Sequence, residues 1–330
     1  MRIFCGLPRS SLIQPCDRTR ANASAGCALT IGNFDGVHLG HQAMLRELKK
    51  EADARGLATC VMTFAPHPRE YFAPSSAPKR ISTLRDKATA IKACGIDNLV
   101  ILPFNEQLAS MSPESFVMDM LVGSLQTKFL LIGDDFKFGA KRAGDFNLLT
   151  ALAGQAGYGL AAMPSVEADG VRVSSSIVRK ALTDGRLTDA AAMLGRSYSI
   201  SGHVIHGAKL GRTLNVPTLN IAFKHQHPAA AGIFVVRVFG LADQPLRGVA
   251  NFGTRPALDP SDVNGGRVLL ETYCLDWPAA LGSEGGYGKI IRVELLHKLH
   301  DELAYDGLES LKAGISSDIA LASDYFRQNT

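Results

Sequence analysis

Hydrophobic positions in the first half of the chain alternate between two spacings. Short apolar runs of strand length are separated by segments in which apolar residues recur every three to four positions, as on a helix face. The predicted strands cover residues 28–33, 59–64, 98–103, 129–133 and 160–164. The predicted helices cover residues 42–54, 84–94, 113–125, 146–154 and 176–183, with Ser112 and Pro113 suited to start the third. Strands alternating with helices predict an α/β domain whose parallel sheet is covered on both faces.

The pattern changes after about Arg196, where strands follow one another without intervening helices. These strands are predicted at residues 198–205, 232–239, 248–252, 268–276 and 289–295. Turns rich in Gly and Pro separate them, and the one clear helix covers residues 308–327. This part predicts an antiparallel barrel or sandwich with a closing helix. The boundary falls between Gly185 and Arg196, so we expect domains at 1–187 and 188–330.

The composition agrees with two globular domains. At roughly 150 residues per domain, 330 residues suggest about two. Hydrophobic residues make up 46% and charged residues 20%, which excludes a disordered chain or a coiled-coil rod. Apolar runs such as residues 129–132 are far shorter than the roughly 18 residues of a membrane span, and the N-terminal apolar stretch is too short for a secretory signal. We therefore expect a cytoplasmic protein without a membrane partner.

Charge and aromatic residues argue against a nucleic-acid partner. The 35 Lys and Arg exceed the 31 Asp and Glu by four, and no basic cluster is longer than Lys49-Lys50. This modest surplus fits a pocket for a small polyanion better than a groove for a polymer. An RNA-binding barrel would also need stacking aromatics on one face, but Trp277 is the only tryptophan and the tyrosines are dispersed: Tyr198, Tyr273 and Tyr287. The six cysteines form no C-x-x-C pair and are expected to be reduced, mostly structural thiols.

The strongest chemical signal is the segment G-N-F-D-G-V-H-L-G-H at residues 32–41. Its glycines allow a tight turn, and His38 and His41 are three residues apart at the start of a predicted helix. A helix N-terminus attracts phosphate, and two imidazoles there can hydrogen-bond a phosphoryl group as charge builds on its oxygens. The alternative, two surface histidines beside a glycine-rich turn, does not explain why strand, turn, histidines and helix occur in this order.

This segment resembles the H-x-G-H signature of nucleotidyltransferases, and its extended form resembles the prokaryotic bifunctional riboflavin kinases/FMN adenylyltransferases, or FAD synthetases. The resemblance covers nearly the whole chain. Further matching segments are F-A-P-H-P at 64–68, residues 132–145, and V-S-S-S-I-V-R at 173–179, where Ser176 replaces the usual threonine. The resemblance implies a Rossmann-like nucleotidyltransferase domain with catalytic His38 and His41. It also implies that ATP is bound by Gly32, Asn33, Phe34, Ser174, Ser175, Ser176 and Arg179. The flavin-binding residues that it implies are His67, Asp135 and Phe136.

Some of these residues fit ligand binding without the resemblance. Three serines before a helix can hold phosphate and Arg179 can neutralise it, although serine caps beside a solvated arginine would look the same. Asp135 and Phe136 follow a buried strand, at the edge where open α/β sheets bind ligands. His67 stands between two prolines, where it could serve only to rigidify a loop.

In the second half, residues 211–220 resemble the riboflavin kinase motif G-R-x-L-G-x-P-T-A-N. The resemblance implies that Gly211 binds ATP and that Thr218 and Asn220 hold Mg²⁺ together with the ATP phosphates. Residues 248–256 resemble a second family segment. L-E-T-Y-C-L-D at 270–276 resembles the strand whose glutamate, here Glu271, deprotonates riboflavin. Without the resemblance, P-T-L-N would be a common strand entry and Glu271 an ordinary edge-strand glutamate.

The implied function is phosphorylation of riboflavin to FMN and adenylylation of FMN to FAD, with ATP and Mg²⁺ in both reactions and pyrophosphate released in the second. Four departures lie in the kinase half: Asn215 for glycine, Leu219 for alanine, Tyr273 for histidine and His300 for arginine. Leu219 is expected to add bulk next to the phosphate loop, and His300 removes a permanent charge. An alternative therefore stays open, in which only the FMN adenylyltransferase is active and the barrel is a flavin-binding or regulatory module.

Overall fold

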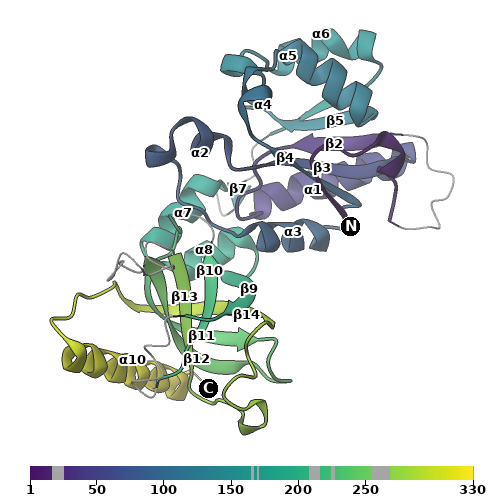
Figure 1. Ribbon diagram of the computed structural model, residues 1–330. Helices are drawn as coiled ribbons and strands as arrows, with labels where there is room; N and C mark the ends of the chain where they lie inside the picture. The colour runs from purple at the N-terminus through teal and green to yellow at the C-terminus, as the bar shows by residue number, and fades with distance from the viewer. Residues whose placement is uncertain are drawn as a thin grey trace. The chain divides into compact units, whose positions relative to one another are not determined.

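The computed structural model describes residues 1–16, 26–164, 167–168, 171–207, 216–223, 227–254 and 268–329. Packing divides the chain into two compact units (Figure 1). The first contains Met1–Pro78 and Lys87–Ser174, and the second contains Lys79–Asp86 and Ser175–Thr330. Residues 175–187 thus pack with the second unit, and the functional boundary at residue 187 stays a prediction.

The first unit is built on a six-stranded sheet in the order β1-β4-β3-β2-β5-β6, with every neighbouring pair parallel. Its strands are β1 (Arg2–Cys5), β2 (Cys27–Ile31), β3 (Ala58–Ala65), β4 (Asn98–Pro103), β5 (Thr127–Gly133) and β6 (Gly159–Met163). The helices are α1 (Leu39–Arg55), α2 (Pro68–Phe72), α3 (Leu84–Ala93, which begins in the second unit), α4 (Glu106–Ser110), α5 (Pro113–Ser115) and α6 (Phe146–Ala156). The hairpin β7 (Glu167–Ala168) and β8 (Val171–Arg172) follows.

Two apolar cores cover the two faces of this sheet. Along β2, Ala28 joins the core beneath α1 and α3, whereas its neighbours Cys27 and Leu29 join the core beneath α6. Successive strand residues point to opposite faces, so this division places helices on both sides. The predicted parallel sheet with two covered faces is confirmed.

Most predicted elements of this unit are present within a few residues, but the short helices α2 and α4 and the β7–β8 hairpin were not among them. The edge strand β1 was not predicted, because four largely exposed residues carry no periodic pattern. The helix expected at 113–125 starts as predicted, with the Ser112 hydroxyl accepting a bond from the Ser115 amide at 3.1 Å. It then continues as a π-helix over Phe116–Ser124.

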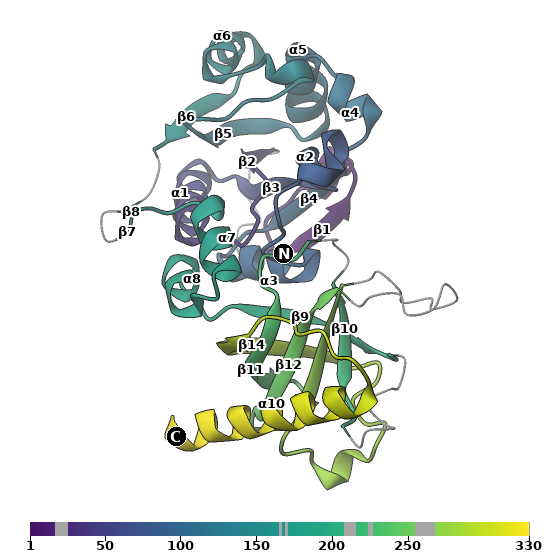
Figure 2. The ribbon, with the colours of Figure 1, turned by 90° about the vertical axis from the view of Figure 1, so that its left-hand side faces the viewer.

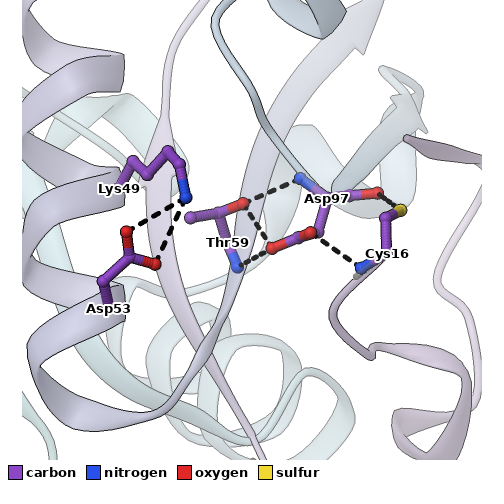
Figure 3. Close-up of polar contacts among 5 residues, drawn as sticks. All are labelled: Cys16, Lys49, Asp53, Thr59 and Asp97. Atoms are coloured by element: carbon purple, nitrogen blue, oxygen red, sulfur yellow. Dashed lines mark hydrogen bonds and ion pairs between the residues drawn. The ribbon is translucent and has the colours of Figure 1, made fainter. Parts of the chain in front are cut away.

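A buried carboxylate fastens the N-terminal segment to the sheet (Figure 3). Asp97 is 6% exposed, and its carboxylate accepts hydrogen bonds from the Cys16 amide at 2.8 Å and from the amide and hydroxyl of Thr59 at 2.9 and 2.8 Å. The Thr59 hydroxyl in turn accepts a bond from the Asp97 amide at 2.7 Å. The carboxylate is therefore well satisfied where it joins β3, the start of β4 and the chain at Cys16.

The second unit is a closed antiparallel barrel in the order β10-β13-β12-β11-β14-β9. Its strands are β9 (Ser199–Ile205), β10 (Leu219–Phe223), β11 (Gly232–Phe239), β12 (Leu246–Thr254), β13 (Val268–Cys274) and β14 (Ile290–His300). Its helices are α7 (Ser175–Thr183), α8 (Leu187–Leu194) and α10 (Leu308–Gln328), the last lying along the outside of the barrel (Figure 2). The barrel and its closing helix are confirmed, whereas β10 and α8 were not among the predicted elements.

The segment Lys79–Asp86 packs with the barrel. Ile81 belongs to the barrel's core, and its carbonyl accepts a bond from the Tyr198 hydroxyl at 2.8 Å. The Asp86 carboxylate accepts a bond from the Ser201 amide of β9 at 3.2 Å. All six cysteines are free, as expected. In the described ranges, no helix combines the length and apolar character needed to cross a bilayer.

Candidate functional site

The turn after β2 has an unusual backbone. Phe34 and Val37 adopt φ values of 47° and 43°, in the left-handed region that bulky side chains rarely occupy. Both side chains are fully buried, so the surrounding core holds this conformation in place. Strained backbone that is fixed by its surroundings is concentrated at functional sites. The turn delivers the chain directly into α1.

The two predicted catalytic histidines meet at the N-terminus of α1. His38 caps the helix, with its Nδ1 accepting a bond from the His41 amide at 3.4 Å. The two rings stack with centroids 3.7 Å apart, and the Phe34 ring lies 4.9 Å from His41. A Cβ on Gly40 would lie 3.1 Å from the His38 ring and 3.5 Å from the Val173 carbonyl. Glycine at this position therefore leaves room for the His38 ring and the chain that leads to Ser174.

Burial controls the charge of His41. Desolvation holds the pKa of His41 well below its ordinary value, and the positive charges of His38 and Lys87 lower it further. His41 is therefore neutral at neutral pH and can donate a ring N–H without carrying charge. Among the described residues, the buried His41 Nδ1 and Asn33 Oδ1 have no hydrogen-bond partner. The position of His41 at a helix N-terminus suits a phosphate ligand.

The other predicted ATP-binding residues of this half fall into both units. Gly32, Asn33 and Phe34 form the turn, and Ser174 ends the first unit. Ser175 and Ser176 begin α7 in the second unit, one residue earlier than expected for the helix start. Arg179, also in α7, donates from Nε to the Lys79 carbonyl.

The predicted flavin-binding residues follow strands that neighbour β2 at the same edge of the sheet. His67 comes after β3, while Asp135 and Phe136 come after β5, and both strands run parallel to β2. Open α/β sheets bind ligands at this carboxyl edge. Asp135 is largely exposed and pairs with Arg172 at 3.5 Å.

His67 also has a local structural role. Its Nδ1 accepts a bond from the Arg69 amide at 3.0 Å, and the Glu70 carboxylate accepts one from the His67 amide at 2.9 Å. This reciprocal capping box starts α2. The suggestion that His67 orders a loop therefore has support, and a flavin contact stays a prediction.

Lys87 and Thr63 were not singled out from the sequence, yet both reach the turn that carries the histidines. Lys87 is 3% exposed, and its Nζ donates to Thr63 Oγ1 at 3.3 Å. Thr63 Oγ1 donates to the Asn33 carbonyl at 3.1 Å. One signal in the sequence could have identified Lys87. It precedes Ile91 by four residues and so shares the helix face that Ile91 buries in the core.

In the barrel, Glu271 occupies the middle of a polar row. It lies directly opposite Asn220 of β10 on one side and Asn251 of β12 on the other. Its neighbour Leu270 points into the barrel core, so this row lies on the outer face. Asn251 was missed from the sequence because pairing between distant strands has no local signal.

The row offers oxygen atoms for a cation or a hydroxyl group. Asn220 is 3% exposed and donates from Nδ2 to the Thr218 carbonyl at 3.2 Å, whereas its Oδ1 and that of Asn251 have no partner in the described parts of the chain. Amide and hydroxyl oxygens are suitable Mg²⁺ ligands, so the residues present fit a magnesium ion. In those same parts no group of three His, Cys, Asp or Glu side chains could hold a metal. Gly211 and Asn215 lie outside the described residues.

Three of the four departures can be located. Leu219 points into the barrel core, and the phosphate loop beside which its bulk was expected lies outside the described residues. Tyr273 packs beneath α10. The Nε2 N–H of His300 donates to the Asp318 carboxylate of α10 at 2.8 Å, and so joins β14 to that helix. Each of these side chains has a packing role, Leu219 in the barrel core and Tyr273 and His300 against α10.

Comparison with known proteins gives a consistent result for both halves. A family model described as FAD synthetase matches residues 20–177, and one described as riboflavin kinase matches residues 194–326. The chain is 42% identical over 301 residues to a bifunctional riboflavin kinase/FMN adenylyltransferase of Escherichia coli, covering 91% of this chain and 93% of that protein. It is 40% identical to the protein of that name from Haemophilus influenzae, covering 91% and 94%. A crystal structure of a Streptococcus pneumoniae chain described as a macrolide-efflux protein matches with a TM-score of 0.68 and 23% identity over 98% of this chain and 100% of that one, which shows the fold alone.

Proposed function

This chain belongs to the family of bifunctional riboflavin kinases/FMN adenylyltransferases, and from that premise we propose how its residues divide the two reactions. The enzyme phosphorylates riboflavin to FMN and adenylylates FMN to FAD. We assign adenylyl transfer to residues 1–187 and riboflavin phosphorylation to residues 188–330. The separate matches at 20–177 and 194–326 support this division.

Both reactions belong to this chain, so the alternative of a barrel without kinase activity is not retained. The riboflavin kinase model covers the barrel itself, and the similar relatives carry both activities in their names. ATP and the flavins riboflavin, FMN and FAD follow as substrates and products. Mg²⁺ bound with ATP would supply positive charge that neutralises the phosphates in each reaction. A cytoplasmic location and the lack of a nucleic-acid partner stay predictions from the sequence.

Adenylyl transfer relies on the stacked histidines at the start of α1. A phosphate oxygen of FMN attacks the α-phosphorus of ATP, the bond from that phosphorus to the bridging oxygen breaks, and pyrophosphate leaves. His38 and His41 donate hydrogen bonds to the phosphoryl oxygens as their negative charge increases. Gly32, Asn33, Phe34, the serines at 174–176 and Arg179 bind ATP, and the residues after β3 and β5 hold the flavin. The unpartnered, buried Nδ1 of His41 is the observation that carries this assignment.

Riboflavin phosphorylation relies on the polar row of the barrel. Glu271 accepts the proton of the terminal riboflavin hydroxyl, whose oxygen attacks the γ-phosphorus of ATP while ADP leaves. Thr218 and Asn220 would hold Mg²⁺ with the ATP phosphates, and Gly211 would bind ATP. The unpartnered Oδ1 of Asn220 beside Glu271 supports this arrangement.

Incubation with riboflavin, ATP and Mg²⁺, followed by chromatography of the flavins, tests the proposed function. We expect FMN to appear first and FAD to follow. A preparation that converts supplied FMN to FAD but never consumes riboflavin would contradict the kinase assignment. A preparation that stops at FMN would contradict the adenylyltransferase assignment.

A further inference from the structure

Lys87 is a buried cation next to the adenylyl-transfer residues. It lies on the apolar face of α3, with Ala88 and Ile91 buried beside it, and is 3% exposed. Burying an ammonium group costs free energy unless hydrogen bonds and charge compensate for it. The charge of Lys87 must therefore be compensated by its surroundings.

Two hydrogen bonds connect Lys87 to the turn that carries the histidines. Its Nζ donates to Thr63 Oγ1 at 3.3 Å, and the same hydroxyl donates to the Asn33 carbonyl at 3.1 Å. Because Lys87 supplies the proton on one side, the Thr63 hydroxyl is oriented toward Asn33. Asn33 directly precedes Phe34, where the backbone becomes left-handed. Lys87 thus helps to fix the start of the turn.

Lys87 also acts on His41 through its charge. The His41 ring is desolvated and stacked 3.7 Å from His38, and the lysine charge adds to the repulsion that a second proton there would meet. The carboxylate of the same turn, Asp35, is 2% exposed and has interactions of its own. A neutral His41 has one donor and one acceptor ring nitrogen, and its tautomer decides which is which. A protonated ring would have two donors and no acceptor.

We propose that Lys87 is a positioning residue for adenylyl transfer, which fixes the histidine turn through Thr63 and adds positive charge to the surroundings of the histidine pair. The proposal rests on the proposed function of this site. The Lys87 side chain makes two contributions, one through its hydrogen bond and one through its charge. The hydrogen-bond chain sets the geometry of the turn, and the charge adds to the effects of desolvation and of His38 on His41.

The pH profile of FAD formation from supplied FMN tests this role. Lys87→Met keeps the length of the side chain but removes its charge, so His41 should bind a proton at higher pH. We expect the acid limb of the kcat/KM profile to move to higher pH, with a loss of rate on that limb and a smaller loss at pH 8. Lys87→Arg keeps the charge and should keep the wild-type limb.

Two further variants separate charge from geometry. Thr63→Val breaks the chain to Asn33 but leaves the lysine charge, so kcat should fall several-fold while the acid limb stays in place. Lys92→Met, an exposed lysine on the same helix, should change neither quantity. If Lys87→Met lowers the melting temperature so far that it cannot be assayed, Lys87→Gln measured against Lys87→Arg replaces it.

The outcomes distinguish this proposal from the proposed function. A wild-type enzyme that forms no FAD from FMN would contradict the function itself. Normal FAD formation by the wild type, with an acid limb that stays in place in Lys87→Met, would overturn only the role of Lys87. An equal displacement of the limb in Thr63→Val would show that the effect comes from distortion of the turn and not from charge.

Discussion

The two sites are assigned to different reactions, so substitution of a single residue can test each site separately. His41→Ala removes an imidazole of the adenylyl-transfer pair, so FAD formation should be lost while FMN accumulates from riboflavin.

Glu271→Gln keeps the shape of the side chain but removes the proton acceptor, so riboflavin phosphorylation should fall about a hundredfold or more, with riboflavin binding changed much less. Flavin chromatography with riboflavin or FMN as the substrate measures both. Equal loss of both products in a folded single variant would contradict two separate sites.

Asp97 and Asp53 make a matched pair of carboxylates in the first unit (Figure 3). Asp97 is buried and accepts three hydrogen bonds, whereas Asp53 forms an exposed ion pair with Lys49 at 3.0 Å. Asp97→Ala would leave buried donors without an acceptor and should lower the melting temperature of this unit by roughly 5–10 °C. Asp53→Ala should lower it by about 2 °C or less. Similar losses for the two variants, measured by circular dichroism, would show that burial does not set the value of these contacts.

At the scale of elements, the regular pattern of apolar residues predicted most strands and helices, because strand and helix periods are local properties. The local signal did not extend to register. Asn251 lies opposite Glu271 only because β12 and β13 pair as they do, and the turn at Phe34 depends on core packing from several elements. Lys87 of α3 is connected to the histidine turn only through Thr63, so no spacing along the chain reveals this connection. The site was therefore predictable where a motif is contiguous and missed where it is assembled from distant segments.

The contact between β14 and α10 should respond to pH. Partial burial alone would lower the pKa of His300, but its bonds to Asp318 and to the Asp301 carbonyl, with the charges of both carboxylates, raise it above the ordinary value of 6.5. A histidine whose pKa is raised on folding stabilises the folded state when it is protonated. Its full contribution is present below about pH 6.5 and is lost as the pH rises through the folded-state pKa. The stability advantage of the wild type over His300→Gln should therefore shrink between pH 6 and pH 8.5.

Thermal unfolding at a series of pH values measures this advantage. Asp318→Asn removes one of the two carboxylate charges that raise the pKa of His300 and should weaken the same pH dependence, while Asp301, which pairs with Lys298, still contributes. A wild-type advantage that stays constant from pH 6 to pH 8.5 would show that His300 does not titrate as part of this contact.

At the scale of the whole molecule, packing and the two family models divide the chain at different places. The family models leave residues 178–193 unmatched between them, yet much of this stretch is buried against the barrel. Lys79–Asp86 also packs with the barrel, although it lies within the span of the FAD synthetase match. The change of pattern near residue 196 marked where the strands of the barrel begin, but it carried no information about which helix covers them.

A kinase chain should consequently be more stable when it includes α7. Val178, Ala181 and Leu182 of α7 are fully buried in the barrel's core cluster, and residues 188–330 would lack them. Each buried Val or Leu stabilises the fold by about 1.5–3 kcal/mol, so a chain of residues 175–330 should resist urea better than residues 188–330 by several kcal/mol. Leu182→Ala within the longer chain should remove about 2–4 kcal/mol of that difference. Both chains retain Thr218, Asn220 and Glu271, so both should phosphorylate riboflavin while folded; equal urea midpoints would mean that α7 does not support the barrel.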